Sequence, residues 1–235
     1  ILGAGTGESN LFFNVMLHVG TLVAVVAFYH KLVWDLIKEF FLMLKDIFTG
    51  KFKWSKMNYN RNLVVMLIIG LIPLFLLFLP IPGTDMKLKD LADQLSASPV
   101  LIVTACSLIL TSVLLTIGII RNRKSVASTH KHLATKSNAK ATRDNFNVVD
   151  AILVGVTQVC AALLPGLSRS GSTLSVGEMR GISKQKALDY TFVLGIPSIL
   201  AAALLEGVDA IKSPEGLSNI ELIPLIIGMA VSAVV

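Results

Sequence analysis

The sequence predicts an all-α polytopic membrane protein, an inverted-repeat helical bundle that includes a re-entrant helix pair at Val148–Gly181. Three observations support this fold class. Hydrophobic residues form 54% of the chain and charged residues 15%, whereas soluble domains carry about 25% charged residues. Several apolar stretches approach the ~20 residues with which a helix crosses a bilayer. One short segment rich in glycine and serine interrupts this apolar pattern just after residue 164.

Apolar stretches of this length occur at five places, and together they define a single transmembrane domain over residues 1–235. The expected spans are about 11–29, 62–79, 99–120, 187–205 and 222–235. Pro73 is expected to kink the second span, and Pro99 suits the start of the third because a missing N–H costs little there. Because the chain does not begin with Met and ends inside an apolar stretch, we expect a fragment of a longer protein.

Residues 31–48 differ from these spans. Their apolar side chains recur at i, i+3 and i+4 spacing, and lysine, aspartate and glutamate take the other side. This periodicity predicts an amphipathic helix that lies at the membrane interface or against the bundle. Trp34, Trp54 and Tyr59 flank it, as aromatic residues do at membrane–water interfaces.

The formal net charge of +6 is concentrated in two loops. Residues 31–61 and 121–147 are rich in lysine and arginine, whereas 80–98 and 206–221 carry more acidic residues. The positive-inside rule places the first two in the cytoplasm, including a basic cytoplasmic loop at 121–147. Charge confined to the ends of spans indicates contact with a membrane and argues against nucleic acid, which needs a basic surface interleaved with aromatic residues.

The stretch from Val148 to Leu164 is short for a span. Its ~17 residues reach about 26 Å as a helix, slightly less than the hydrocarbon core. Arg180, Lys184 and Lys186 follow it and favour the cytoplasmic side again. We therefore expect residues 148–181 to enter the membrane and return to the same side. Irregular backbone at the tip is tolerated only where it lines a polar cavity, which is how discontinuous helices build substrate sites.

That tip is the strongest candidate site. Its polar and glycine residues are Gly166, Ser168, Arg169, Ser170, Gly171, Ser172 and Thr173. Arg169 can bind two phosphate oxygens side by side, and the hydroxyls can donate to others. Gly171 lets the backbone turn, and Ser172 or Thr173 is expected to cap a second half-helix that points its positive end at the tip. The alternative is a structural loop in which Arg169 pairs with backbone carbonyls or with an acid elsewhere.

A base is missing from this segment. No His, Asp or Glu lies within residues 165–173, although a serine nucleophile needs one nearby. Gln158 is a candidate substrate contact, but an amide cannot act as a base. His18 is either a proton-transfer group that faces the site or a neutral histidine bound to a neighbouring helix. Residues 13–22 faintly repeat residues 188–197, which favours an inverted repeat.

The residues now point to a known family. Residues 155–158, 164–173, 181–184 and 192–197 resemble the second half of the undecaprenyl-pyrophosphate phosphatase (bacitracin-resistance) family, and 13–25 resembles its first long span. The resemblance implies removal of one phosphate from a polyprenyl pyrophosphate lipid, which regenerates the lipid carrier for cell-wall polymers. It implies that Arg169 grips the pyrophosphate, with Ser168, Ser170 and Thr173 as supporting donors.

The resemblance also implies a location and missing parts. The protein would lie in the bacterial inner (plasma) membrane with its pocket open to the external side, and a homodimer is compatible with it. The family's Glu-x-x-x-Glu motif and its Ser-rich turn ending in Gly-His do not occur in this chain. Those motifs would supply the base or nucleophile and the ligands of a divalent cation, Mg²⁺ or Ca²⁺. We therefore expect no metal ligands in this chain and no activity from residues 1–235 alone.

A different function class remains open at this point. Inverted repeats, broken helices and an anion site at the bilayer midplane are equally typical of transporters. The alternative is therefore a transporter or flippase for a phosphate-headed polyprenyl lipid. Phosphate release without lipid movement in sealed vesicles would favour the phosphatase, and the reverse would favour the transporter.

Overall fold

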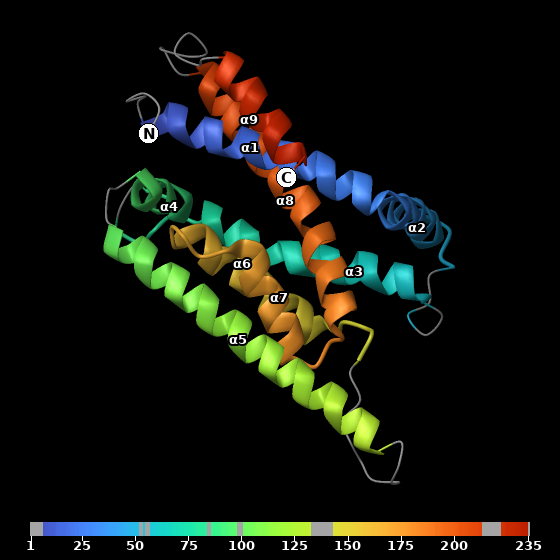
Figure 1. Cartoon of the computed structure of the whole chain (residues 1–235). Helices are drawn as coiled ribbons and strands as arrows, with labels where there is room; N and C mark the ends of the chain where they lie inside the picture. The colour runs from blue at the N-terminus through green and yellow to red at the C-terminus, as the bar shows by residue number, and fades with distance from the viewer. Residues whose placement is uncertain are drawn as a thin grey trace. The chain divides into compact units, whose positions relative to one another are not determined.

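The computed structural model describes residues 7–51, 54, 57–83, 86–97, 101–132, 143–212 and 222–234, and within these ranges the regular structure is helical, apart from isolated β-bridges. The helices are α1 (Gly7–Phe28), α2 (His30–Phe48), α3 (Tyr59–Leu71), η2 (Ile72–Phe78), α4 (Leu88–Ala97), α5 (Leu101–His132), α6 (Val148–Leu163), α7 (Arg169–Met179), α8 (Lys184–Lys212) and α9 (Leu222–Val234) (Figure 1). The predicted all-α polytopic membrane protein is confirmed. The inverted repeat stays a prediction.

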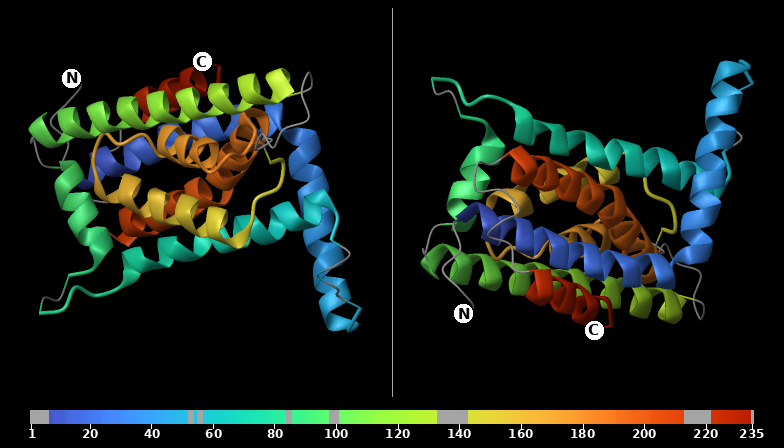
Figure 2. Two further views of the ribbon diagram at one scale, coloured as in Figure 1. Left: turned by 90° about the horizontal axis from the view of Figure 1, so that it is seen from below. Right: turned by 90° about the horizontal axis from the view of Figure 1, so that it is seen from above.

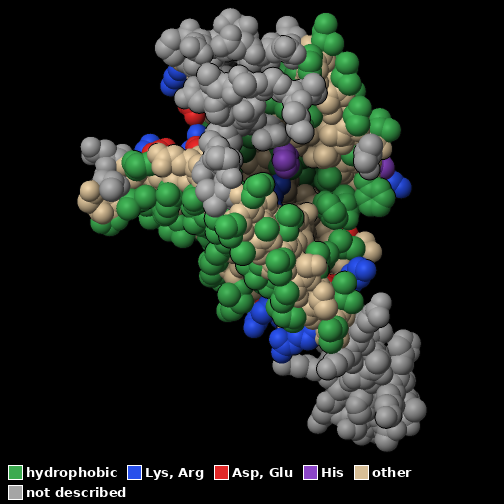
Figure 3. All heavy atoms as spheres, turned by 60° about the vertical axis from the view of Figure 1, so that its left-hand side comes forward, with side chains coloured by type: hydrophobic (Ala, Val, Ile, Leu, Met, Phe, Trp, Pro, Cys, Tyr) green, Lys and Arg blue, Asp and Glu red, His purple; other side chains and the backbone are tan. Residues whose placement is uncertain are grey.

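Three described helices are long and apolar enough to cross a membrane, or up to four if a bent pair counts as one span. They are Tyr59–Phe78, Leu101–Asn122 and Lys184–Asp209, and the bent pair joins Val15–Phe28 to His30–Phe48. Large apolar side chains are widely exposed, and hydrophobic side chains cover much of the face shown in Figure 3. Exposed apolar surface of this extent suits contact with lipid.

The chain divides into two compact units, of which the first comprises Ile1–Val33 and Phe192–Val235. In this unit α1 packs along α9. Gly20 and Gly228 lie where the two helices approach, and a Cβ at Gly228 would come within 2.6 Å of Leu17. Ser232 Oγ donates a hydrogen bond to the Leu17 carbonyl at 2.9 Å. Small residues and a serine hydroxyl thus hold this helix pair together, as is usual between membrane helices.

The second unit, Trp34–Thr191, contains the candidate site. The α5 helix runs beside the α6–α7 pair and packs against α7 (Figure 1, Figure 2). The other side of α6 packs on α3 and η2. The Tyr190 hydroxyl donates to the Met66 carbonyl at 2.7 Å, and its ring stacks on Phe146 with centroids 4.0 Å apart. These contacts fix the segment that enters α6 against α3.

The α3 helix changes to a 3₁₀ helix at Ile72, next to Pro73. Proline has no N–H, so a carbonyl in the preceding turn is left without a donor. Gln158 of α6 supplies one, because its Nε2 donates to the Gly70 carbonyl at 3.2 Å. The helices approach closely here, since a Cβ on Gly155 would lie 2.5 Å from that carbonyl oxygen and 2.7 Å from Pro73. The α6 helix thus packs directly against this break in α3.

Two parts of the chain are more helical than the sequence suggested. The α5 helix continues to His132, so the first part of the expected loop at 121–147 is helical and not loop. No glycine or proline occurs at 121–132 to stop the helix where its apolar stretch ends. The α4 helix occupies most of the expected 80–98 loop, because Leu88, Leu91, Ala92 and Leu95 give it a weak apolar side. Pro99 and residues 133–142 lie outside the described residues.

Candidate active site at the tip of a helical hairpin

The α6 and α7 helices form an antiparallel hairpin whose two ends meet. Asp150 lies in the first turn of α6, and Arg180 follows the last residue of α7. Arg180 Nε donates to Asp150 Oδ1 at 2.7 Å. The chain therefore runs out along α6, turns and returns along α7 to its starting level. This is the geometry that a re-entrant pair needs, and its depth in a bilayer stays a prediction.

The base of the hairpin is a closed polar network around Asp150. This carboxylate is fully buried, and its second oxygen lies 3.0 Å from Arg143 Nη2. The Asn147 N–H also donates to it at 3.1 Å, which completes a capping box at the start of α6. The Arg143 N–H donates to the Gly181 carbonyl at 2.8 Å. A buried carboxylate with two arginine partners and a backbone donor is well compensated, so the base is a structural site.

The tip begins where α6 ends at Leu163. Gly166 adopts a φ of +87°, in the left-handed region that favours glycine. A Cβ there would also meet Thr104 of α5 at 2.9 Å. The Ser168 N–H donates to the Thr111 hydroxyl of α5 at 3.1 Å. The tip is therefore held against α5 on one side by a close approach and a hydrogen bond.

Ser168 is the N-cap of α7. Its backbone is extended, and its Oγ accepts the Gly171 N–H at 3.1 Å. The expectation that Ser172 or Thr173 caps this helix is wrong, because α7 starts at Arg169. The first turn of a helix leaves N–H groups without intrahelical acceptors, and those of Arg169 and Ser170 are the first in α7. The positive end of α7 thus lies at the tip.

Arg169 is half-buried in the first turn of α7, and no described residue forms a hydrogen bond or an ion pair with its guanidinium. Ser170, next to it, is exposed. The structural alternative, in which Arg169 pairs with a carbonyl or an acid, therefore has no partner in the part of the chain that is described. A guanidinium beside free helix N–H groups is suited to an anion such as phosphate.

The family model of the bacitracin resistance protein BacA matches residues 1–235. The chain belongs to this family. Relatives named undecaprenyl-diphosphatase include those of Bacteroides fragilis, 31% identical over 94% of this chain and 69% of the relative, and of Alkaliphilus metalliredigens, 33% identical over 94% and 70%. That of Geotalea daltonii is 30% identical over 97% and 72%. These names do not favour the transporter alternative.

The side chains of Ser172 and Thr173, the other two hydroxyl residues near the tip, are buried in the protein. Ser172 is fully buried, and its Oγ has no hydrogen-bond partner in the described structure. Thr173 is buried as well, and its Oγ1 donates to the Arg169 carbonyl at 2.8 Å. Thr173 therefore braces the turn that carries Arg169. A direct contact between either side chain and a substrate stays a prediction, as do the roles of Gly166 and Gly171.

The structure does not bring Gln158 to the tip. Gln158 is 1% exposed, and its amide binds the break in α3 described above. Its position indicates that it seats α6. His18 is exposed on α1, in the other compact unit, so its role stays a prediction. Among the described residues, no group of three or more His, Cys, Asp and Glu could hold a metal ion. The divalent cation, Mg²⁺ or Ca²⁺, stays a prediction.

Sequence reasoning missed the partner surface of the hairpin on α5. Its small and polar residues are Thr104, Ser107, Thr111 and Gly118, and they line the side that meets α7. Glu178 of α7 is 2% exposed, and neither carboxylate oxygen has a partner among the described residues. A Cβ on Gly118 would come within 2.8 Å of Glu178 Oε2. Near-heptad spacing of small residues in α5 is the signal that could have revealed this surface.

Proposed function

We propose that this protein removes one phosphate from undecaprenyl pyrophosphate, giving undecaprenyl phosphate and inorganic phosphate, and so recycles the lipid carrier of cell-wall synthesis. The observation that carries the proposal is the half-buried Arg169 at the capped start of α7, whose guanidinium has no partner among the described residues. The names of the BacA relatives support the same substrate.

The tip suits the charge of a diphosphate. Arg169 would bind two of its oxygens side by side, and the N–H groups at the start of α7 would bind another. The Ser170 hydroxyl is exposed beside them, and the Ser168 hydroxyl, whose oxygen accepts the cap bond, can still donate its hydrogen. Phosphoryl transfer depends mainly on positioning and on neutralising charge. These groups would stabilise the negative charge as water attacks the terminal phosphorus and the P–O bond to the lipid phosphate breaks.

We further propose that the site faces the external side of the bacterial inner membrane, with the base of the hairpin towards the cytoplasm. The support is the lysine- and arginine-rich composition of residues 31–61 and 121–147. Ser170→Cys tests this, because the position is exposed. A membrane-impermeant thiol reagent added outside sealed cells should label it. Labelling only after the cytoplasm is opened would contradict the orientation. A homodimer is compatible with the proposal and can be measured by light scattering.

Phosphate release tests the proposed reaction. A form of the protein that carries the Glu-x-x-x-Glu motif implied by the resemblance is reconstituted into proteoliposomes with undecaprenyl pyrophosphate, and inorganic phosphate and lipid movement across the bilayer are measured together. Arg169→Ala should slow release at least ~10²-fold, whereas Arg121→Ala, which alters an exposed arginine on α5, should not. Lipid movement without phosphate release would overturn the proposal in favour of the transporter alternative.

A further inference from the structure

The side chains of α2 fall into four columns that each repeat every seven residues. The columns are Trp34, Phe41 and Phe48; Lys31, Lys38 and Lys45; Glu39 and Asp46; and Leu36 and Met43. A step of seven residues rotates an α-helix by only about 20°, so each column stays on one side of the helix. Each of the four columns therefore faces its own direction around α2.

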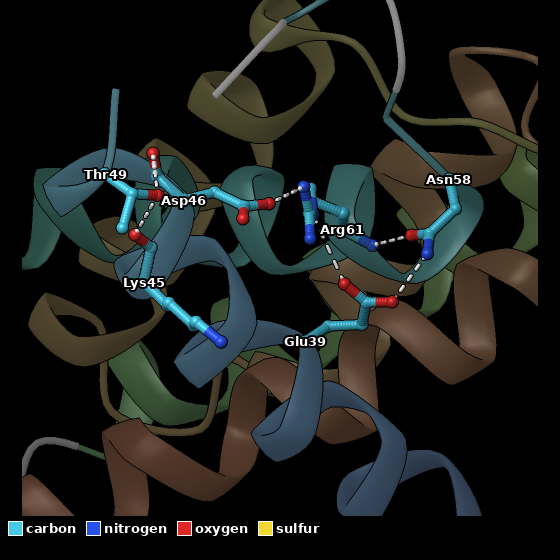
Figure 4. A network of polar contacts seen from close by, with 6 residues as sticks. All are labelled: Glu39, Lys45, Asp46, Thr49, Asn58 and Arg61. Carbon is cyan, nitrogen blue, oxygen red and sulfur yellow. Dashed lines mark hydrogen bonds and ion pairs between the residues drawn. The ribbon is translucent and has the colours of Figure 1, made fainter. Parts of the chain in front are cut away.

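The side of α2 that faces the protein holds Leu36 and Met43, which are 6% and 5% exposed. Beside them Arg61 of α3 joins both acids of the third column (Figure 4). Its Nε lies 3.2 Å from Glu39 Oε2, and its Nη1 lies 2.8 Å from Asp46 Oδ2. Both acids are thus paired with a single guanidinium, which offsets one of their two negative charges, and their side chains are only 16% and 31% exposed.

Asn58 completes this network at the start of α3. Its Nδ2 donates to Glu39 Oε1 at 2.6 Å, and its Oδ1 accepts the Arg61 N–H at 2.7 Å as the N-cap (Figure 4). Arg61 is therefore held at three points and Glu39 at two. A clamp of this kind fixes how α2 is rotated about its own axis, and so determines which columns remain outside.

The clamp changes the charge that α2 presents to its surroundings. By sequence α2 carries as many lysines as acids, since Asp35 adds to Glu39 and Asp46. With the two clamped acids turned inward, the exposed charges are the three lysines against Asp35 alone. No described acid forms an ion pair with these lysines, and Lys38 Nζ lies 5.4 Å from the centre of the Trp34 ring. The outer side of α2 is therefore positively charged.

The aromatic column lies next to the lysine column, because Lys38 and Lys45 follow Trp34 and Phe41 by four residues. Trp34, Phe41 and Phe48 are 58%, 64% and 86% exposed. An exposed aromatic stripe bordered by lysines is the arrangement of a helix that lies at a membrane surface. Its lysine stems can extend along the apolar boundary while their ammonium groups reach the headgroups.

We propose that α2 binds anionic phospholipid, with its aromatic column at the boundary of the acyl chains and its lysine column on the headgroup phosphates. The charge of the outer side selects this occupant, because neutral lipid would satisfy the aromatic column but not the lysines. A second copy of the chain fits less well, since α2 is 19 residues long and a stable coiled coil needs at least three to four heptads. This binding is independent of the proposed phosphatase reaction.

Tryptophan quenching tests this proposal in the whole protein. The chain has two tryptophans, so Trp54→Phe leaves Trp34 as the only reporter. The protein is placed in nanodiscs of phosphatidylcholine that contain an equal fraction of either dibrominated phosphatidylglycerol or dibrominated phosphatidylcholine. The anionic lipid should quench Trp34 more strongly. Lys31→Gln, Lys38→Gln and Lys45→Gln should each reduce the preference about fivefold, the factor expected for one lysine near an anionic surface.

The matched control removes three exposed lysines elsewhere, at Lys87, Lys184 and Lys212, and should leave the preference intact. Arg61→Gln should weaken it without altering any lysine, because it releases Glu39 and Asp46. Adding Glu39→Gln and Asp46→Asn to that variant should restore the preference. Equal quenching by the two lipids would overturn the proposal. A second result would also overturn it: no quenching by either lipid, together with crosslinks between copies of the Phe41→Cys variant. That result would assign this side of α2 to contact with a second chain.

Discussion

The two ends of the α6–α7 hairpin both carry arginine, and the chain treats them in opposite ways. At the base, Arg143 and Arg180 lie within 3.0 Å and 2.7 Å of the buried Asp150 carboxylate. At the tip, Arg169 is half-buried and its guanidinium has no partner among the described residues. The base contains the carboxylate that balances its arginines, whereas at the tip the guanidinium remains available for a ligand.

The comparison shows how a structural arginine can be told from a binding one in a membrane protein. An arginine within a bilayer costs ~2.5–3.5 kcal/mol on insertion scales, so a fold normally compensates it. The base does so with a carboxylate, a capping box and a backbone bridge from Arg143 to Gly181. At the depth predicted for the tip, Arg169 would retain that cost until a diphosphate binds. The sequence alone shows three similar arginines, and only their partners in the structure distinguish the two at the base from the one at the tip.

Changing the tip should have the largest effect. Arg169→Ala is expected to lower kcat/KM for undecaprenyl pyrophosphate at least ~10²-fold, the loss seen when one transition-state donor is removed. Arg169→Lys should also be poor, because an ammonium cannot make the two-pronged contact. Thermal unfolding should be unchanged or shifted upward, since no internal bond is lost. If kcat/KM of Arg169→Ala stayed within a few-fold of the parent value, Arg169 would have a structural role, like the arginines at the base.

Changing the base should act on stability. Asp150→Ala removes the partner of two arginines, and breaking a buried pair costs up to about 3–5 kcal/mol. Arg143 and Arg180 have side chains 41% and 39% exposed, so water compensates them in part and we expect about 2 kcal/mol. Unfolding in detergent with increasing denaturant measures this loss. If Asp150→Ala had the same free energy of unfolding as the parent but no activity, Asp150 would belong to the active site.

The contact of α6 with the break in α3 gives a third effect, similar in size to that at the base. Gly155→Ala places a methyl group 2.5 Å from the Gly70 carbonyl oxygen and 2.7 Å from Pro73. Overpacking of this kind costs about 1–3 kcal/mol. Gly207→Ala on α8 is the matched control, because a Cβ there would meet no atom within 4 Å. Equal shifts of the unfolding temperature in the two variants would show that this contact does not hold α6 in place.

Among the substitutions expected to destabilise the protein, that of the Ser168 cap should cost the least. Ser168→Ala loses the acceptor of the Gly171 N–H and is expected to cost about 1 kcal/mol, whereas Ser168→Asn should restore most of it. Activity separates the two roles of this residue. If Ser168 also donates to the substrate, Ser168→Asn should recover the unfolding temperature but not the rate. Full recovery of both would limit Ser168 to capping.

Length and charge in the sequence located the hairpin, because Val148–Leu164 is short and positive residues follow it on the same side. They could not locate the cap of α7, since Ser168, Ser172 and Thr173 are all good capping residues. The partner of Gln158 could not be read either, because it depends on a carbonyl freed by Pro73 in another helix. Helix α5 ran beyond its apolar stretch because helix formation does not need apolar residues.

The central claim is that the guanidinium at the tip is the anion-binding group of this protein. Titration calorimetry with a non-hydrolysable methylene diphosphonate analogue of the polyprenyl pyrophosphate tests it most directly, because binding is measured apart from chemistry. The account predicts that Arg169→Ala weakens binding at least ~10-fold, the loss of a charge-assisted hydrogen bond, while Arg121→Ala leaves the Kd unchanged. An equal Kd for the parent and Arg169→Ala would contradict it.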